Sequence, residues 1–417
     1  MAFLKSQKRL KKRPFLICFC VTAQEITRKV ETECTTEVVF DVGSLYSRFQ
    51  ELRDSRKPRG VRYRLVNILV LMVLAKICGE DTPSGIADWV QHRSEQLSAM
   101  LKLKRRTMPH HSTYRRITEG VVDVEELEQV VSAVLSEKKF FGKQVLLSID
   151  GKVLRGTLDG AQNGTYLLAA YLPSEGIVLM EIALEGKGCE IPGAVKLLNM
   201  VDLRGKVVMG DALHTQRAIS ILIVEAGGDY IWFAKGNQSQ MEEDIRLWFE
   251  PEPDPIPGMG RLPKDFETAK QVSKGHGRLE ERTLTVSSQL KDFLDWPYLE
   301  QVFQLERRFV STKTGEVQEQ VAYGFTSLPR DEITPKKLLK KVRSYWGIEN
   351  GLHYRRDVTL HEDRTRMTKG NTAQVMACLN NLVIGLVFTK TDYSYLPHAR
   401  RFFDAYPDRA FALVTRL

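Results

Sequence analysis

Four side chains near the end of the chain have types and spacing that suit a binding or catalytic site. If residues 341–357 form an α-helix, the four share one face, because residues three, four or seven apart lie above one another. They are Tyr345, Glu349, His353 and Arg356. Charged groups are seldom buried without partners, and a solvated stripe rarely mixes a carboxylate with an aromatic ring and an imidazole. The spacing predicts a functional face around Glu349. A surface helix with a local ion pair is the alternative.

Two more carboxylates follow short apolar segments upstream. The run 145–149 leads to Asp150, and the run 206–210 leads to Asp211. Apolar runs of this length, bounded by small residues, are typical of buried strands. A carboxylate at the end of such a strand lies at an edge of the sheet where ligands gather, although a turn or cap role is the alternative for either one. With Glu349, the two aspartates form a set of three acids that could meet at one site.

Six short motifs occur in a fixed order between about residues 45 and 390. They are DSRKPRGVRYRL (54–65), SIDGKVLRG (148–156), GDALHTQ (210–216), AKGNQ (234–238), GHGR (275–278) and YWGIENGLH (345–353), with Asp357, Glu362 and Asp363 after the last. In this set and order the chain resembles insertion-sequence transposases of the DDE class, specifically the ISAs-type group. The resemblance implies an RNase H-like catalytic core in which Asp150, Asp211 and Glu349 bind metal.

The chemistry implied by the resemblance is metal-dependent cleavage and joining of DNA strands. Two Mg²⁺ or Mn²⁺ ions about 3.5–4 Å apart would activate the attacking water and stabilise the departing 3′ oxygen. In this hypothesis Asp150 bridges both ions, Asp211 completes one coordination shell and Glu349 completes the other. The freed 3′-OH then attacks a target strand. The alternatives are an RNase H-like nuclease without strand transfer and an inactive DNA-binding derivative.

Polar side chains around the three acids are expected to contact DNA or to support the metal ligands. The expected DNA contacts are Lys152, Arg155, Arg343, Tyr345, His353 and Arg356. Arg356 fits the family spacing of a basic residue seven positions after the catalytic Glu, whereas Tyr345 stands where related families often have Arg. The expected supporting residues are His214, Asn350, Asp357 and Asp363. A solvated surface charge is the alternative for the basic residues, and a structural hydrogen bond is the alternative for His214.

Composition favours a polyanionic partner. The net charge is +9 and the sequence pI is near 9.1, which suits double-stranded DNA. The longest apolar runs, 65–78 and 375–388, read as buried helices too short to span a bilayer, so we expect no membrane partner. Six cysteines without a C-x-x-C pair favour free thiols. We therefore expect a bacterial, cytoplasmic, nucleoid-associated protein that binds transposon ends and target DNA as a homodimer assembled on that DNA.

The elements that must position the acids predict an α/β fold. We expect an RNase H-like core, with a mixed sheet and flanking helices, that is interrupted by a β-strand-rich insertion and preceded by a helical domain. The predicted boundaries are 1–44 for a disordered basic leader, 45–138 for a helical DNA-binding domain, 139–250 for the first part of the core, 251–330 for the insertion and 331–417 for the C-terminal helical part. Basic residues of the helical domain expected to grip DNA are Arg59, Arg62, Arg105 and Arg106. The three acids can converge only if the insertion projects out of the core.

Overall fold

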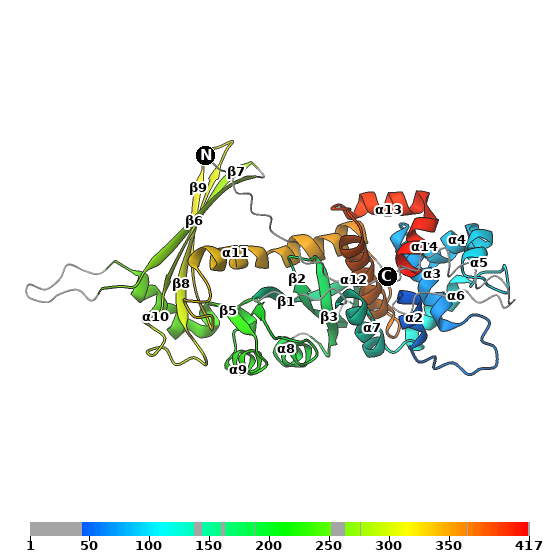
Figure 1. The fold of residues 1–417 in the computed structure, drawn as a ribbon, viewed down its shortest axis with the longest axis horizontal. Helices are drawn as coiled ribbons and strands as arrows, with labels where there is room; N and C mark the ends of the chain where they lie inside the picture. The colour runs from blue at the N-terminus through cyan, green and yellow to red at the C-terminus, as the bar shows by residue number, and fades with distance from the viewer. Residues whose placement is uncertain are drawn as a thin grey trace, which may run out of the picture. The chain divides into compact units, whose positions relative to one another are not determined.

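The computed structural model describes residues 44–136, 144–159, 163–186, 188–251, 263–275, 277–364 and 366–415. Within these residues one mixed sheet has its strands in the order β3-β2-β1-β4-β5-β9-β8-β7-β6. Figure 1 shows helices on both sides of this sheet. The predicted leader over 1–44 lies outside the described residues, apart from Ser44, which caps the helix α2.

The first five strands form the predicted core of the sheet. Their bounds are Val145–Asp159 for β1, Asn163–Leu172 for β2, Ile177–Leu184 for β3, Lys206–Met209 for β4 and Asp229–Ala234 for β5. β1, β2 and β3 form an antiparallel meander, whereas β4 pairs in parallel with β1 and with β5. Parallel neighbours need crossover connections, and helices α8 (Glu190–Asn199) and α9 (Arg217–Glu225) lie in them. The predicted mixed sheet with flanking helices is confirmed.

The strand-rich stretch between the second and third acid continues the same sheet. Its strands are β6 (Glu267–Gly275), β7 (Arg278–Ser287), β8 (Gln301–Ser311) and β9 (Val317–Thr326), all antiparallel to their neighbours. β9 pairs with β5, with Ile231 opposite Thr326. The stretch thus lies beyond β5, outside the first five strands, and joins them as added strands of one sheet. The edge of β5 presents unpaired backbone groups, and β9 satisfies them.

Two helices cover opposite faces of the extended sheet. α10 (Ser239–Phe249) packs on β8 and β9, and α11 (Pro335–Tyr345) packs across β6, β7 and β1. α11 begins with Thr334, whose hydroxyl accepts a hydrogen bond from the backbone N–H of Lys337, and with Pro335 in its first turn. Its buried face contributes Leu338, Leu339 and Val342 to a cluster with strand side chains. α11 therefore fixes where the segment carrying Glu349 leaves the sheet.

The remaining helices come from both ends of the described chain and pack together. They are α2 (Leu45–Gln50), α3 (Leu65–Ile77), α4 (Pro83–His92), α5 (Ser94–Met100), α6 (His111–Gly120), α7 (Val124–Ser136), α12 (Thr372–Lys390), α13 (Leu396–Ala405) and α14 (Pro407–Thr415). Every residue of α3 is buried, and α3 contacts α12, α13 and α14. The helices before residue 137 thus share a core with those after residue 371.

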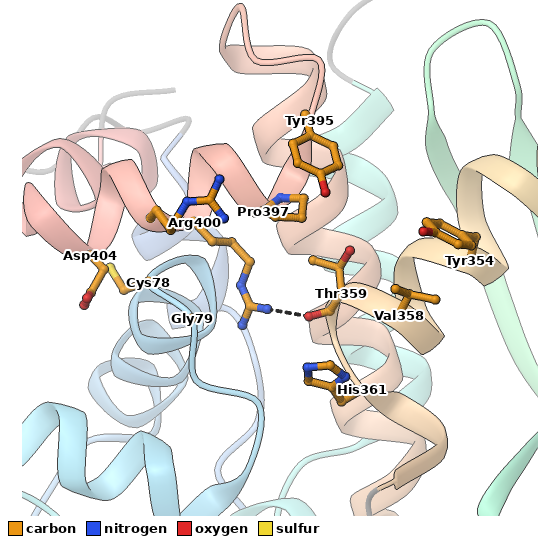
Figure 2. Close-up of a pocket in the computed structure, with 11 residues that line it drawn as sticks. Cys78, Gly79, Tyr354, Val358, Thr359, His361, Tyr395, Pro397, Arg400 and Asp404 are labelled. Carbon is orange, nitrogen blue, oxygen red and sulfur yellow. Dashed lines mark hydrogen bonds between the residues drawn. The ribbon is translucent and has the colours of Figure 1, made fainter.

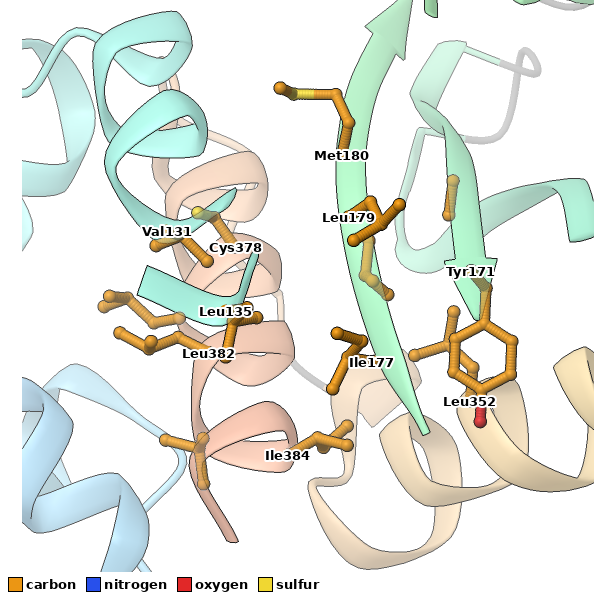
Figure 3. Close-up of a cluster of buried hydrophobic side chains, with 14 of the residues drawn as sticks. Val131, Leu135, Tyr171, Ile177, Leu179, Met180, Leu352, Cys378, Leu382 and Ile384 are labelled. Atoms are coloured by element: carbon orange, nitrogen blue, oxygen red, sulfur yellow. The ribbon is translucent and has the colours of Figure 1, made fainter. Parts of the chain in front are cut away.

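α12 is a buried helix between the helical layer and the sheet. Figure 3 shows Cys378, Leu382 and Ile384 of α12 among side chains of α7 and β3. The helix has 19 residues and is longer than the predicted apolar run, 375–388. By length and composition it could cross a membrane. However, 83% of its most apolar window is buried inside the protein. Its burial is that of a core helix.

Candidate active site

The two aspartates lie side by side because their strands are parallel neighbours in register. β1 pairs with β4 from Val145 opposite Lys206 to Ser148 opposite Met209. Asp150 and Asp211 each follow the last pair by two residues, and adjacent strands are about 4.8 Å apart. Asp150 is not at a strand end as predicted, since β1 runs on to Asp159 and Asp150 pairs with Ala169 of β2. The open edge arises because β4 stops at Met209.

Asp211 is held by the turn that follows β4. It caps a short 3₁₀ helix, η1 (Ala212–His214), and its Oδ1 accepts hydrogen bonds from the backbone N–H of Leu213 at 3.0 Å and of His214 at 3.4 Å. The ring Nδ1 of His214 lies 2.7 Å from the same oxygen. Burial raises the pKa of Asp211, but the hydrogen bonds and charge of His214 outweigh it and hold this pKa below its ordinary value. Asp211 is therefore held ionised.

Asp150 has a histidine partner from a distant part of the chain. Its Oδ2 lies 3.0 Å from Nε2 of His353, and its Oδ1 accepts a hydrogen bond from the backbone N–H of Gly151 at 3.0 Å. His353 is 8% exposed, so it cannot reach a DNA backbone as predicted. Each aspartate thus has one buried histidine beside it, His214 for Asp211 and His353 for Asp150. The two imidazoles fix the orientation of the two carboxylates.

The segment carrying Glu349 is not one α-helix. After α11 ends at Tyr345, the chain forms two π-helical stretches, η3 (Ile348–His353) and η4 (Arg355–Thr359). A π-helix bonds residues five apart, so each turn takes more residues than an α-helical turn. Arg356, seven positions after Glu349, therefore turns into the core, whereas His353 contacts Asp150. The prediction that all four side chains share one face is wrong for Arg356.

Two glycines let this segment lie against β2. A Cβ on Gly351 would come within 2.5 Å of the Tyr171 hydroxyl oxygen, and one on Gly347 within 3.1 Å of Pro173 Cβ. These glycines weaken a helix by roughly 1 kcal/mol each, but here they allow a close approach that larger residues would block. The close approach of this segment to β2 accompanies the contact between His353 and Asp150.

Tyr345 lies within the electrostatic field of the candidate site. Tyr345 is 9% exposed, and its pKa is raised by burial and then by the negative charges of Asp150, Asp211 and Glu349. Tyr345 is thus too buried to contact DNA as predicted, although the charges of all three acids reach its hydroxyl. Glu349 itself is exposed. Among the described residues no three His, Cys, Asp or Glu side chains lie close enough together to hold one ion.

Arg356 is a structural residue and not a DNA contact. Its guanidinium is fully buried and forms ion pairs with Glu181 and, at 2.8 Å, with Glu362. Burial lowers the pKa of Arg356, but the two carboxylates outweigh this and raise it above its ordinary value. Asn380 donates to the other oxygen of Glu362 at 2.8 Å. The seven-residue spacing from Glu349 suggested a phosphate contact, but π-helical geometry turns this side chain into the core.

Lys152 is also occupied within the protein. Its side chain is 8% exposed, forms an ion pair with Asp357, and lies 3.6 Å from Glu362 and 3.8 Å from Asp363. Its predicted role as a DNA contact is therefore wrong, and Asp357 and Asp363 serve it as counter-ions. Sequence reasoning missed Glu181, although a lone acid in the apolar run of β3 was a usable signal.

The other predicted contacts remain on the surface. Arg155 has a side chain 78% exposed, with Asp363 at 3.7 Å. Asn350 is exposed, and its side chain donates to the backbone carbonyl of Trp346 at 3.4 Å. The remaining exposed residues are Arg343 on α11 and Arg59, Arg62, Arg105 and Arg106 in the N-terminal helical part. Apart from Asn350, which was predicted as a supporting residue, these six side chains are the predicted DNA contacts that burial leaves exposed.

A pocket of about 410 Å³ is lined partly by residues that follow Glu349 in the chain, but not by the three acids. Figure 2 shows Tyr354, Tyr395, His361 and Arg400 around it. Arg400 donates a hydrogen bond to the backbone carbonyl of Thr359 at 2.8 Å and is also paired with Asp81. None of Asp150, Asp211 and Glu349 lines the pocket. This pocket is therefore separate from the three carboxylates.

Comparison with known families gives this constellation a context. Residues 141–386 match the family model described as "Transposase DDE domain", and residues 46–134 match the one described as "DDE_Tnp_1-associated". The chain belongs to the DDE transposase family. The predicted resemblance is confirmed, and membership implies that the mixed α/β core is RNase H-like. The acids Asp150, Asp211 and Glu349 all lie inside the matched transposase domain.

Similar proteins carry transposase names. The chain is 27% identical over 354 residues to "Putative transposase YncI" of Escherichia coli O157:H7, which covers 84% of this chain and 88% of that protein. It is 26% identical over 356 residues to "H repeat-associated putative transposase YhhI" of Escherichia coli K12, covering 84% of this chain and 91% of the relative. The similarity thus extends over most of the DDE transposase chain.

Proposed function

We propose that this transposase binds the ends of an insertion sequence, cuts DNA there and joins the ends to a target through Asp150, Asp211 and Glu349. The observation that supports the proposal is the contact of His353 Nε2 with Asp150 Oδ2 at 3.0 Å, which brings the segment of Glu349 to the in-register strands that lead to Asp150 and Asp211. The three acids come from two neighbouring parallel strands and one distant segment, and no single local motif would bring them together. The sequence order of the family motifs and the transposase names of the relatives support the same reaction.

The donor set suits Mg²⁺ or Mn²⁺. Hard carboxylate oxygens are the ligands Mg²⁺ prefers, and a few carboxylates suffice because the ion keeps several waters. Asp150, Asp211 and Glu349 would hold the metal, which in a pair of ions activates water and stabilises the leaving 3′ oxygen. The exposed Glu349 is the ligand that has to close onto the two aspartates, since no three acids in the described chain already enclose an ion.

The chain's own residues then have distinct roles. His214 and His353 hold Asp211 and Asp150 in position, each through one short contact. Exposed basic side chains on β1 and α11 offset the repulsion between the carboxylates and the DNA backbone. These are Arg155, Arg343, Lys336, Lys337 and Lys340. In this proposal they bring phosphate groups to the acids before metal neutralises the site.

The N-terminal helical part would supply a second grip on the DNA. Arg59, Arg62, Arg105 and Arg106 are exposed there, and their charge suits phosphate contacts that carry no sequence information. Two element ends require two active sites, so we propose a homodimer that assembles on DNA. The described cysteines Cys78, Cys189 and Cys378 are free thiols, which supports the bacterial cytoplasm as the compartment.

The test uses the whole chain on DNA that carries the element ends, with Mg²⁺ present. Asp150→Asn, Asp211→Asn and Glu349→Gln should each lower cleavage by at least about a thousandfold while DNA binding persists. Arg364→Gln replaces an exposed side chain that follows Glu349 in the chain. This variant is the control and should cleave normally. A variant that still cuts removes its residue from the metal site. Nicked DNA without joined product would favour a nuclease that lacks strand transfer.

A further inference from the structure

Two arginines face each other across neighbouring strands on the α11 side of the sheet. Arg282 of β7 is directly opposite Arg307 of β8 in the antiparallel register. One step closer to α11, Leu284 and Leu305 form the equivalent pair and pack against that helix. Arg282 and Arg307 therefore lie on the same face as α11, immediately beyond its apolar contact. Like charges placed opposite one another in a ladder destabilise the sheet.

A third arginine from α11 completes the cluster. The charges of Arg343 and Arg307 both contribute to lowering the pKa of Arg282, after the larger effect of burial. The acid that balances them is Glu280, whose Oε2 lies 2.5 Å from Arg282 Nη2. No carboxylate among the described residues pairs with Arg307, and its Nε is buried without a hydrogen-bond partner there. We call Arg282, Arg307 and Arg343 the arginine cluster.

The side chains around the arginine cluster are neutral and polar. Gln271 of β6 lies opposite Arg282, and Gln320 of β9 lies opposite Arg307, so the four form one row across the strands. Ser273 accepts a hydrogen bond from Arg282 at 3.2 Å. A row of amides and guanidiniums with a single carboxylate keeps a net positive charge. Holding a guanidinium nitrogen buried and unpaired costs free energy that an anionic partner would recover.

We propose that the arginine cluster binds phosphate groups of the DNA backbone next to the cleavage site. The inference rests on the proposed function and adds a further DNA contact to it. Guanidinium forks match phosphate oxygens in two-pronged hydrogen bonds, and two such groups on adjacent strands can serve consecutive phosphates of one DNA strand. Arg343 lies on α11 six residues before Glu349, so in this proposal DNA held by the cluster continues toward the acids. The extended sheet is thus a DNA-positioning surface.

The neighbouring Arg308 is a matched control. It follows Arg307 in the same strand but projects from the opposite face, where it lies 3.3 Å from Glu319. Arg307→Gln and Arg308→Gln remove the same charge from positions one residue apart. A general electrostatic attraction to DNA would respond equally to both changes, whereas a built phosphate site would respond only to the first.

The experiment measures DNA binding by the full chain as a function of salt, together with thermal unfolding without DNA. Arg307→Gln should weaken binding about tenfold and reduce the magnitude of the slope of log K against log salt by about one. Arg308→Gln should change both by less than a factor of two. Without DNA, Arg307→Gln should unfold at the same or a higher temperature than the wild type, because it relieves repulsion from Arg282 and leaves no carboxylate unpaired.

The outcomes distinguish a failure of the arginine-cluster proposal from a failure of the proposed function. If the wild type fails to bind DNA, the proposed function itself falls. If the wild type binds and the two variants bind equally well or equally poorly, the cluster is not a phosphate site, while the proposed function stands. If Arg307→Gln unfolds at a lower temperature, the arginine has a structural role instead. If inorganic phosphate alone raises the unfolding temperature of the wild type as much as DNA does, the cluster binds the free anion and the proposal is overturned.

Discussion

Replacing Arg356 distinguishes a buried structural arginine from a DNA contact. Its guanidinium is fully buried between Glu181, which is 1% exposed, and Glu362, which is 6% exposed. In Arg356→Gln, Glu362 keeps Lys152 at 3.6 Å and Asn380 at 2.8 Å, but Glu181 loses its ion-pair partner. Removing one partner of a buried pair costs about 3–5 kcal/mol. We therefore expect a loss of that size in the free energy of unfolding.

Urea denaturation of the wild type and the variant measures this difference, with the midpoint shifting and the slope unchanged. Arg356→Lys keeps the charge but loses the two-pronged geometry, so its loss should be smaller. Arg364→Gln is the control, since that side chain is exposed, and it should change stability by less than about 0.5 kcal/mol. If Arg356→Gln unfolds at the wild-type urea concentration yet loses DNA affinity, the structural assignment of Arg356 is wrong.

Two further changes test the surroundings of the site. Burial and the charge of Glu181 raise the pKa of Glu128 to about 8. The folded state therefore holds this proton between about pH 4.3 and pH 8 while the unfolded chain has lost it, so stability should fall as the pH rises through that window. Glu128→Gln should flatten the dependence of the free energy of unfolding on pH, measured by urea denaturation at each pH. An unchanged pH dependence would contradict the raised pKa of Glu128. Gly351→Ala should destabilise the protein by about 1–3 kcal/mol, since its Cβ would lie 2.5 Å from the Tyr171 hydroxyl oxygen. Tyr171→Phe in the same chain should restore part of that loss in thermal unfolding; equal losses in the single and double variants would exclude this contact.

Local sequence patterns were sufficient to predict the strands that carry the two aspartates. Apolar runs depend on side chains a few residues apart, so β1 begins at Val145 and β4 spans Lys206–Met209, close to the predicted runs 145–149 and 206–210. The same patterns could not give the pairing of β9 with β5, because that contact joins residues far apart in the chain. They also missed that β1 continues past Asp150, since its later residues are held by β2 and not by their own hydropathy.

The sequence by itself determined the family, the identity of the three acids as candidates and the positive charge that suits DNA. Only the tertiary structure decided which basic side chains remain free. Arg356 and Lys152 carry the same charge as Arg155 and Arg343, but Glu181, Glu362 and Asp357 occupy the first two inside the protein. The reason is that a side chain's role depends on its direction and its distant neighbours. The change from α-helical to π-helical turns after Tyr345 altered both, and the residue types alone do not reveal that change.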